Sequence, residues 1–130
     1  MQKPTHKDWL FIAKQDLAGA KRLAAGEAIL SPAFFLTQQV AEKSLKGYLL
    51  FQEQELTRTH DLALLLKSCA RFDKEFLRFV EHVSQLGGYL TNTRYPDDAW
   101  YVPDEPTLGE AIGFAEEIFE FVVKQIAAKE

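Results

Sequence analysis

The sequence predicts an all-α fold, an up-and-down bundle of four long helices with one additional short helix. Residues 34–51 contain no proline and are apolar or small around most of a helical circumference, as expected for a central helix that is covered on most sides. Ser31, just before them, is a predicted N-cap. Residues 5–25 repeat apolar side chains at helical spacing. Thr107 and Glu110 form a capping box that opens a further amphipathic stretch. Helix packed on helix is therefore the expected architecture.

Length and charge narrow the class of protein. A chain of 130 residues fits one domain, residues 1–130, with a single hydrophobic core. The formal net charge is −4, which excludes a chain-wide basic field that attracts nucleic acid. Cys69 is the single cysteine, which excludes an internal disulfide and fits a reducing, cytoplasmic location. The first residues lack a signal-peptide pattern, and no apolar run approaches the roughly 20 residues that cross a bilayer.

A polar seam is expected between the first two helices. Asp16 interrupts the apolar side of the helix over residues 5–25, where a carboxylate needs a partner. Lys43 and Lys46 are the obvious donors, and they share the polar arc of the central helix with Glu42. We interpret this seam chiefly as structural ion pairing, and a catalytic or ligand-binding role for Asp16 is the alternative.

A short helix is expected from Thr59, its predicted N-cap, to about Ala70. His60 would orient the chain where it enters this helix or contact the seam at Lys46. The His60-Asp61 pair resembles part of a metal phosphohydrolase site, but the further His and Asp ligands are missing, so we expect no metal. No Glu-x-x-His occurs in the chain, which excludes a di-iron carboxylate bundle.

The fourth predicted helix begins after Asp73 and runs to about Asn92. Continuing its apolar stripe by four residues reaches Arg94, which would place an always-charged guanidinium toward the interior or an interface. The stripe consists of Phe76, Val80, Val83, Gly87 and Leu90.

Residues 94–106 form the longest segment without a helical pattern. Three prolines forbid a regular helix there. The segment also holds two tyrosines, one tryptophan and four acidic residues. Such aromatic density favours packing onto the bundle or onto a partner over stacking on a ligand, and together with the other flanking aromatics it suggests a homodimer.

Five patches of the sequence are informative together: Trp9-Leu10, Ala13 with Asp16-Leu17, residues 38–46, residues 59–62 and residues 93–97. Taken together, they resemble the small HEPN domain proteins of prokaryotes. The resemblance implies a four-helix bundle with an extra short helix, usually homodimeric. It also implies a minimal nucleotidyltransferase partner in a two-component, toxin–antitoxin-like module, and nucleotide binding by some members.

Many HEPN proteins are metal-independent ribonucleases that use Arg, four to six residues, then His. In that chemistry a histidine removes the proton from a ribose 2′-hydroxyl while arginine stabilises the phosphate. Arg94 matches the arginine, but the three slots for histidine hold Ala99, Trp100 and Tyr101. Tyr101 lies where some members have a tyrosine two residues after the histidine, so Ala99 replaces that histidine.

Three hypotheses follow from these residues. The first is a dimeric HEPN module that binds a nucleotidyltransferase and, through Arg94, a nucleotide or RNA phosphate, without a cofactor. The second is a ribonuclease with a degenerate motif, and the third is an interaction scaffold without a ligand. Candidate phosphate-binding residues are Arg94, Lys43, Lys46, His60 and Tyr95, and candidate catalytic residues are Arg94, Asp97, Asp98 and Tyr101.

Overall fold

The computed structural model describes residues 2–56, 58–89, 93, 95–98 and 100–130, and all regular structure among them is helical. This confirms the predicted all-α fold class. None of the described helices is long and apolar enough to cross a bilayer. The elements are α1 (His6–Ala24), α2 (Leu30–Phe51), α3 (Leu62–Ala70), the 3₁₀-helix η1 (Lys74–Phe79), α4 (Val80–Leu86) and α6 (Glu105–Lys129).

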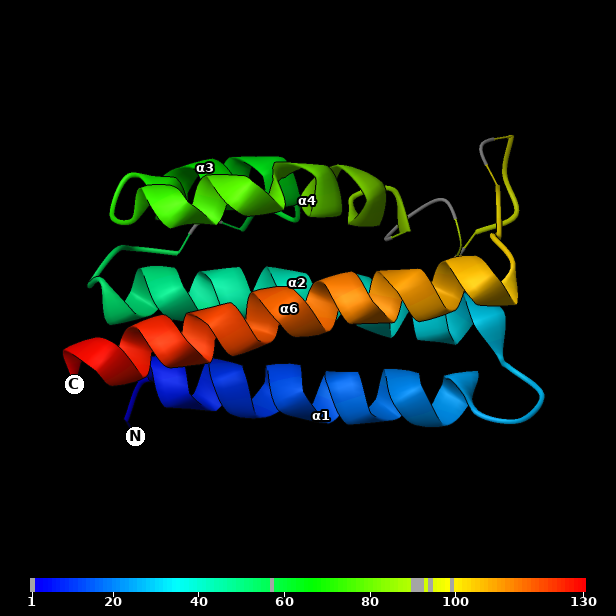
Figure 1. The fold of residues 1–130 in the computed structure, drawn as a ribbon, viewed down its shortest axis with the longest axis horizontal. Coiled ribbons are helices and arrows are strands. Elements are labelled where there is room, and N and C mark those ends of the chain that lie inside the picture. Colours follow the sequence, from blue (N-terminus) through cyan, green and yellow to red (C-terminus); the bar gives the residue numbers. More distant parts are fainter. Residues whose placement is uncertain (1, 57, 90–92, 94, 99) are drawn as a thin grey trace.

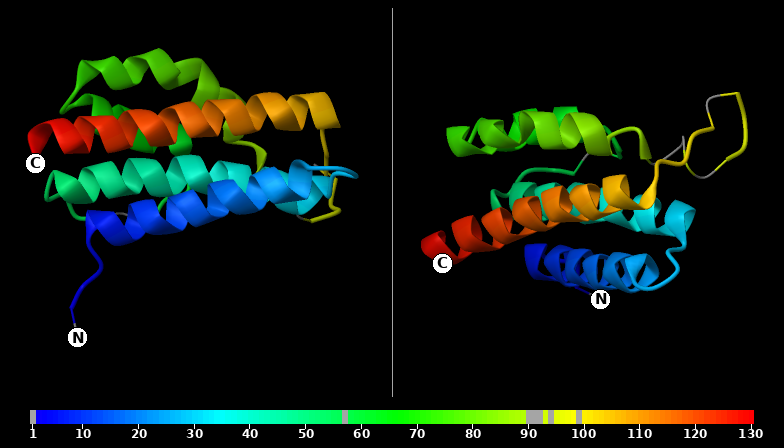
Figure 2. Two further views of the ribbon diagram at one scale, coloured as in Figure 1. Left: turned by 60° about the horizontal axis from the view of Figure 1, so that its bottom comes forward. Right: turned by 45° about the vertical axis from the view of Figure 1, so that its right-hand side comes forward.

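The elements stack in three layers (Figure 1). Helices α2 and α6 form the middle layer, α1 packs on one side of them, and the hairpin of α3 with η1 and α4 packs on the other. The second view in Figure 2 keeps this order, and both chain termini lie at the same end of the bundle in Figure 1. Helix α2 contacts α1, α3, α4 and α6, so it is the central helix that its sequence predicts.

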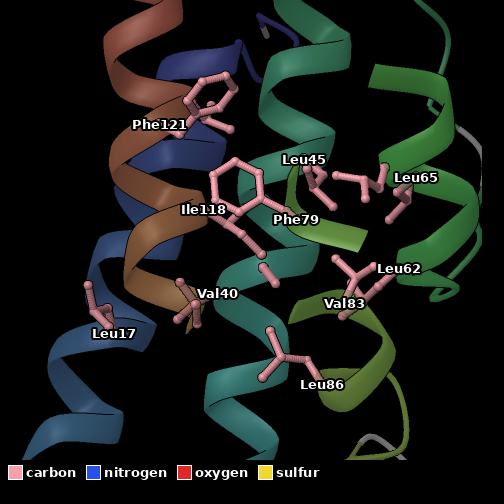
Figure 3. Close-up of a cluster of buried hydrophobic side chains, with 14 of the residues drawn as sticks. Leu17, Val40, Leu45, Leu62, Leu65, Phe79, Val83, Leu86, Ile118 and Phe121 are labelled. Carbon is pink, nitrogen blue, oxygen red and sulfur yellow. The ribbon is translucent and has the colours of Figure 1, made fainter. Parts of the chain in front are cut away.

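The core fills the space on both sides of the middle layer (Figure 3). Leu17 of α1 and Val40 of α2 pack on one side, while Leu45 packs toward the hairpin. Aromatic rings fill the hairpin side, where Tyr48 and Phe76 have ring centroids 4.6 Å apart. Burying large side chains of this kind stabilises by about 1.5–3 kcal/mol each, which is why helices with weak caps persist here.

The predicted N-cap of the central helix is wrong. Helix α2 begins at Leu30, and its N-cap Ile29 makes no side-chain cap hydrogen bond. Ser31 lies inside the first turn, and its hydroxyl donates to the carbonyl of Thr93, 62 residues away. The Ser31 hydroxyl therefore makes a tertiary hydrogen bond instead of the predicted cap hydrogen bond.

Two other helices begin at an aspartate rather than at the expected threonine. Asp61, not Thr59, caps α3 by accepting from the backbone N–H of Leu64. Asp104 caps α6 by accepting from the backbone N–H of Thr107, so α6 begins before the predicted capping box. Aspartate and threonine are both favourable N-cap residues. When two such residues lie a few positions apart, the sequence alone does not show which of them begins the helix.

The predicted apolar stripe of the fourth helix is shifted. Asp73 caps it as expected, by accepting from the N–H of Glu75, but the first six residues form the 3₁₀-helix η1. Three residues per turn bring Phe79 rather than Val80 under Phe76, and Val80 is 50% exposed. Gly87 is exposed as well. The phase argument that directed Arg94 inward used both positions, so it no longer holds.

Candidate functional site

The expected seam joins α1 to α2. The Lys43 ammonium lies 2.7 Å from the Asp16 carboxylate, and both side chains are partly buried. The predicted partner of Asp16 is therefore present. A partly buried ion pair at this position ties the two helices together across the apolar face that Asp16 interrupts.

A second carboxylate, Glu42, is the centre of the seam. Its side chain is 4% exposed and accepts from the Lys46 ammonium at 3.1 Å. His60 Nδ1 lies 3.0 and 3.2 Å from its two oxygens, and the Gln38 amide is 3.4 Å away. Gln38 is fully buried, although nothing in the amino-acid sequence predicts this burial. Glu42 thus holds one cation, one imidazole and one amide around a carboxylate that water hardly reaches.

The Glu42 contact fixes the chemistry of His60. An ionised carboxylate only accepts hydrogen bonds, so the neutral imidazole carries its proton on Nδ1. Nitrogen Nε2 is then the unprotonated one. The side chain of His60 is 60% exposed, which leaves the Nε2 edge available to solvent. This arrangement suits a proton acceptor or a hydrogen-bond acceptor.

Trp9 covers the seam beside Lys46, whose ammonium lies 5.9 Å from the centroid of the indole ring. Trp9 and Lys43 also line a small pocket of ≈ 310 Å³ together with Pro4, Asp8 and Ile12. Within the described ranges, no three His, Cys, Asp or Glu side chains converge in a way that would hold a metal ion.

The aromatic side chains of the segment before α6 face solvent. Tyr95, Trp100 and Tyr101 are 57%, 54% and 60% exposed. Asp97 and Asp98 are exposed too, and the backbone forms a tight turn in which the N–H of Trp100 donates to the carbonyl of Asp97 at 2.9 Å. More than half of each of these three side chains is therefore open to solvent.

The seam and this aromatic segment lie at different levels of α2. Thr93 is buried and accepts from Ser31, in the first turn of α2. Glu42 lies 11 residues further along, roughly 16 Å at 1.5 Å per residue. Arg94 and Ala99, on which the sequence argument concentrates, lie outside the described residues. The structure thus presents two candidate regions, the Glu42–His60 seam and the exposed aromatics next to Arg94 in sequence.

A third polar contact was not foreseen. His82 Nε2 lies 2.6 Å from a carboxylate oxygen of Glu117, and its ring packs at 4.2 Å centroid distance on Phe114. The contact joins α4 to α6 across 35 residues. Neither helix pattern predicts it, because both residues lie on what reads as a solvated face.

Comparison with known proteins gives consistent matches. The profile of the HEPN domain matches residues 6–126. The crystal structure of ST0689, an archaeal HEPN homologue, is similar with 29% identity and a TM-score of 0.77, covering 95% of this chain and 99% of that one. The crystal structure of TT1696 from Thermus thermophilus is similar with 29% identity and a TM-score of 0.80, covering 92% of this chain and 96% of that one. A search of curated proteins finds no match.

Proposed function

The chain belongs to the HEPN domain family, and on that premise we propose that it is a dimeric, single-domain partner of a minimal nucleotidyltransferase in a two-component, toxin–antitoxin-like module. In this proposal it acts in the cytoplasm and binds a nucleotide or RNA phosphate through Arg94. A guanidinium is suited to this because its planar fork of donors matches phosphate oxygens and stays charged at all physiological pH values.

The observation that carries the proposal is the exposure of Trp100 and Tyr101, which follow Arg94 closely in sequence and are each more than half exposed. Exposed aromatic rings forgo a large part of their burial energy, so their presence supports a surface that a ligand or a partner covers. Bases stack on such rings at about 1–3 kcal/mol per base, and partner proteins use the same residue types as anchors.

The seam has a different role in this proposal. Asp16, Lys43, Glu42 and Lys46 are engaged with one another, so their charges are neutralised within the bundle. They serve mainly to fix α1 on α2. His60 alone among the seam residues has a free edge toward solvent, and it is the seam residue best placed to meet a ligand.

The binding proposal is tested with Arg94→Ala. Losing a charge-assisted hydrogen bond is expected to weaken RNA or nucleotide binding by about 10- to 100-fold, while the melting temperature stays nearly unchanged. Fluorescence anisotropy with a labelled single-stranded RNA and calorimetry with ATP measure the affinity, and co-purification with a minimal nucleotidyltransferase tests the partner.

Arg71→Ala is the matched control. Arg71 is exposed at the turn between α3 and η1, at the end of the bundle far from the aromatic segment (Figure 1). Equal affinity losses in the two variants would contradict a specific role for Arg94. A large drop in melting temperature for Arg94→Ala alone would make Arg94 a structural residue instead.

The alternative is a metal-independent endoribonuclease with a degenerate motif, in which Ala99 replaces the histidine. One observation favours it: His60 Nδ1 lies against the Glu42 carboxylate and the His60 side chain is 60% exposed, so a neutral imidazole that donates from Nδ1 offers Nε2 as a proton acceptor. Incubation with RNA in the presence of a chelator is the test. Cleavage that falls about 10²–10⁴-fold in both His60→Ala and Arg94→Ala, but not in His82→Ala, would replace the binding proposal with the enzymatic one.

A further inference from the structure

The N-terminal part of the chain, which forms α1, differs from the rest in the sign of its charge. Residues 1–24 hold five lysine and arginine residues and two aspartates, a net charge of +3. Residues 25–130 hold ten basic and 17 acidic residues, a net charge of −7, and the whole chain therefore carries −4. Such an asymmetry within one chain indicates a surface that meets a charged partner.

The cations of α1 follow its outward side. The three lysines are seven residues apart, so they fall within about 40° of one another and are spaced by about 10.5 Å along the helix axis. Helix α1 is an outer layer that packs on α2 and α6 (Figures 1 and 2). We call the four exposed cations of this helix the basic strip: Lys7, Lys14, Lys21 and Arg22.

Both acidic residues of α1 have partners outside the strip. The Asp8 carboxylate accepts from the backbone N–H of Thr5 at 2.8 Å, as part of the capping box that opens the helix. The Asp16 carboxylate pairs with Lys43 of α2 at 2.7 Å. Neither carboxylate therefore neutralises the basic strip.

Most of the strip has no partner of its own. Lys21 pairs with Glu116 of α6 at 2.6 Å, but its side chain is still 49% exposed. Since an ammonium has three donors, Lys21 can donate to a second carboxylate as well. Among the residues that the structure describes, no ion pair involves the other three cations: Lys7, Lys14 and Arg22.

An apolar row runs beside the lysines. Phe11 and Ala18 are also seven residues apart and both are exposed, Phe11 by 59%. The small side chain of Ala18 allows another helix to approach closely. A charged row beside an apolar row, both with a seven-residue repeat, is typical of a helix that packs along another helix. Helix α1 thus has an outward packing face in addition to the face that it buries in the core.

We propose that this outward face of α1 binds an acidic amphipathic helix of a partner protein. Carboxylates seven residues apart on the partner helix pair with the lysines of the basic strip. An apolar row of the partner helix packs on Phe11 and Ala18. The inference goes beyond the proposed function, because it uses none of the residues assigned there to phosphate binding.

The geometry favours a helix over a nucleic acid or a lipid surface. A partner helix repeats its side chains at the same spacing of about 10.5 Å, whereas phosphates recur about every 3.4 Å along a strand of duplex DNA. A phosphate backbone also has no apolar row to cover Phe11. A lipid surface is wider than the strip and brings anionic headgroups against Asp8 and Glu116 at its two edges. A helix about 10–12 Å wide occupies the strip alone.

A synthetic peptide is the probe for the first test. It has about 21 residues, enough to form a helix, with glutamate at every seventh position and leucine on the neighbouring row. A control peptide has the same composition, but its glutamates are distributed around the helix. The full chain is expected to bind the probe at least about tenfold more tightly than the control peptide. Fluorescence anisotropy at low salt measures both dissociation constants.

A charge reversal in the strip provides the second test. Lys14→Glu turns an attractive pair into a like-charge pair, so the dissociation constant of the probe is expected to rise about tenfold. Lys74→Glu is the matched control: it changes the net charge equally at an exposed position of η1, and the constant should stay within about twofold. A probe with its central glutamate replaced by lysine should regain affinity for Lys14→Glu, which identifies a direct pairing.

The apolar row is tested with Phe11→Ala. Loss of an aromatic anchor is expected to raise the dissociation constant of the probe about fivefold. Phe72→Ala is the matched control, because Phe72 is 40% exposed in the turn after α3, and it should leave the constant unchanged. Circular dichroism melts of all four variants check that each one is folded.

The outcomes decide between an acidic helix and the other anionic partners. Equal affinity for the two peptides overturns the inference, and so does an equal loss in Lys14→Glu and Lys74→Glu. Single-stranded RNA and vesicles of equal parts phosphatidylserine and phosphatidylcholine are tested in parallel. A loss of RNA or vesicle binding that is larger in Lys14→Glu than in Lys74→Glu assigns the strip to that partner and overturns the helix. None of these results depends on Arg94, so this inference and the proposed function can fail separately.

Discussion

Glu42 is the residue on which the seam depends, because its carboxylate is nearly inaccessible to water and yet carries a charge. Lys46, His60 and Gln38 surround it. Taking a carboxylate and an ammonium out of water costs several kcal/mol each, and only good geometry with extra hydrogen bonds offsets that cost. The three partners supply those bonds, so removing one charge harms the fold more than removing both.

The first prediction concerns the Glu42–Lys46 pair. Lys46→Met leaves the buried carboxylate without its cation and is expected to lower the free energy of unfolding by about 3–5 kcal/mol. Adding Glu42→Gln to Lys46→Met removes the orphan charge and should recover most of that loss. Urea unfolding monitored by circular dichroism measures both.

A control for that cycle is Lys14→Met, which removes an exposed lysine from α1 and is expected to change the unfolding free energy by less than about 0.5 kcal/mol. The loss of unfolding free energy in the double variant is compared with the sum of the losses in Lys46→Met alone and Glu42→Gln alone. If the two are equal, the residues are not coupled and this pair does not hold the seam together.

Residue patterns predicted part of the seam. Asp16 was identifiable because a charge on an apolar helix face needs a partner, and the partner was one of two lysines on a neighbouring helix. Gln38 was not identifiable, because an uncharged amide on a helix is equally common at the surface. His60 was expected to contact the seam at Lys46. Only the fold shows that its hydrogen-bond partner in the seam is Glu42.

Among the elements, α6 shows how a cap responds to pH. The hydrogen bonds that Asp104 accepts from the Thr107 hydroxyl and N–H hold the pKa of the carboxyl below its usual 3.8. A lowered pKa means that the ionised form is favoured in the folded state. The stability that the ionised Asp104 cap adds to the fold is therefore complete above the unfolded-state pKa. That stability is lost as the pH falls through the folded-state pKa.

The second prediction follows from that sign. The wild-type melting temperature should fall as pH drops below about 4, and Asp104→Asn should make this acid loss shallower while keeping the cap, because asparagine caps as well as aspartate. Thermal melts across acidic pH values measure the slope. Asp98→Asn, an exposed aspartate outside the helices, is the control, and an equal change in slope there would contradict the assignment to the cap.

Element boundaries show where pattern reasoning fails. A wheel drawn at 100° per residue placed Val80 inward, but η1 has about three residues per turn and turns Phe79 inward instead. Nothing in the six residues of η1 marks them as 3₁₀ rather than α. The choice follows from how the hairpin fits over α2, which is a tertiary constraint.

At the scale of the whole molecule, the fold class was predictable and the spatial relation of the candidate residues was not. Helical periodicity is a local property, so four amphipathic stretches predict a bundle. The contact between Ser31 and Thr93 spans 62 residues and shows that the segment before Arg94 meets the start of α2. The contact between His60 and Glu42 shows that His60 meets the middle of α2. A linear sequence carries no such distances.

The last prediction uses the net charge of −4. With no chain-wide basic field, RNA binding through Arg94 should rest on one or two phosphate contacts, so the logarithm of the binding constant should fall with that of salt with a slope of about −1. Arg94→Ala should reduce the slope by about 0.7, as anisotropy titrations at several salt concentrations measure. A steep slope that Arg94→Ala leaves unchanged would place binding on another cationic surface.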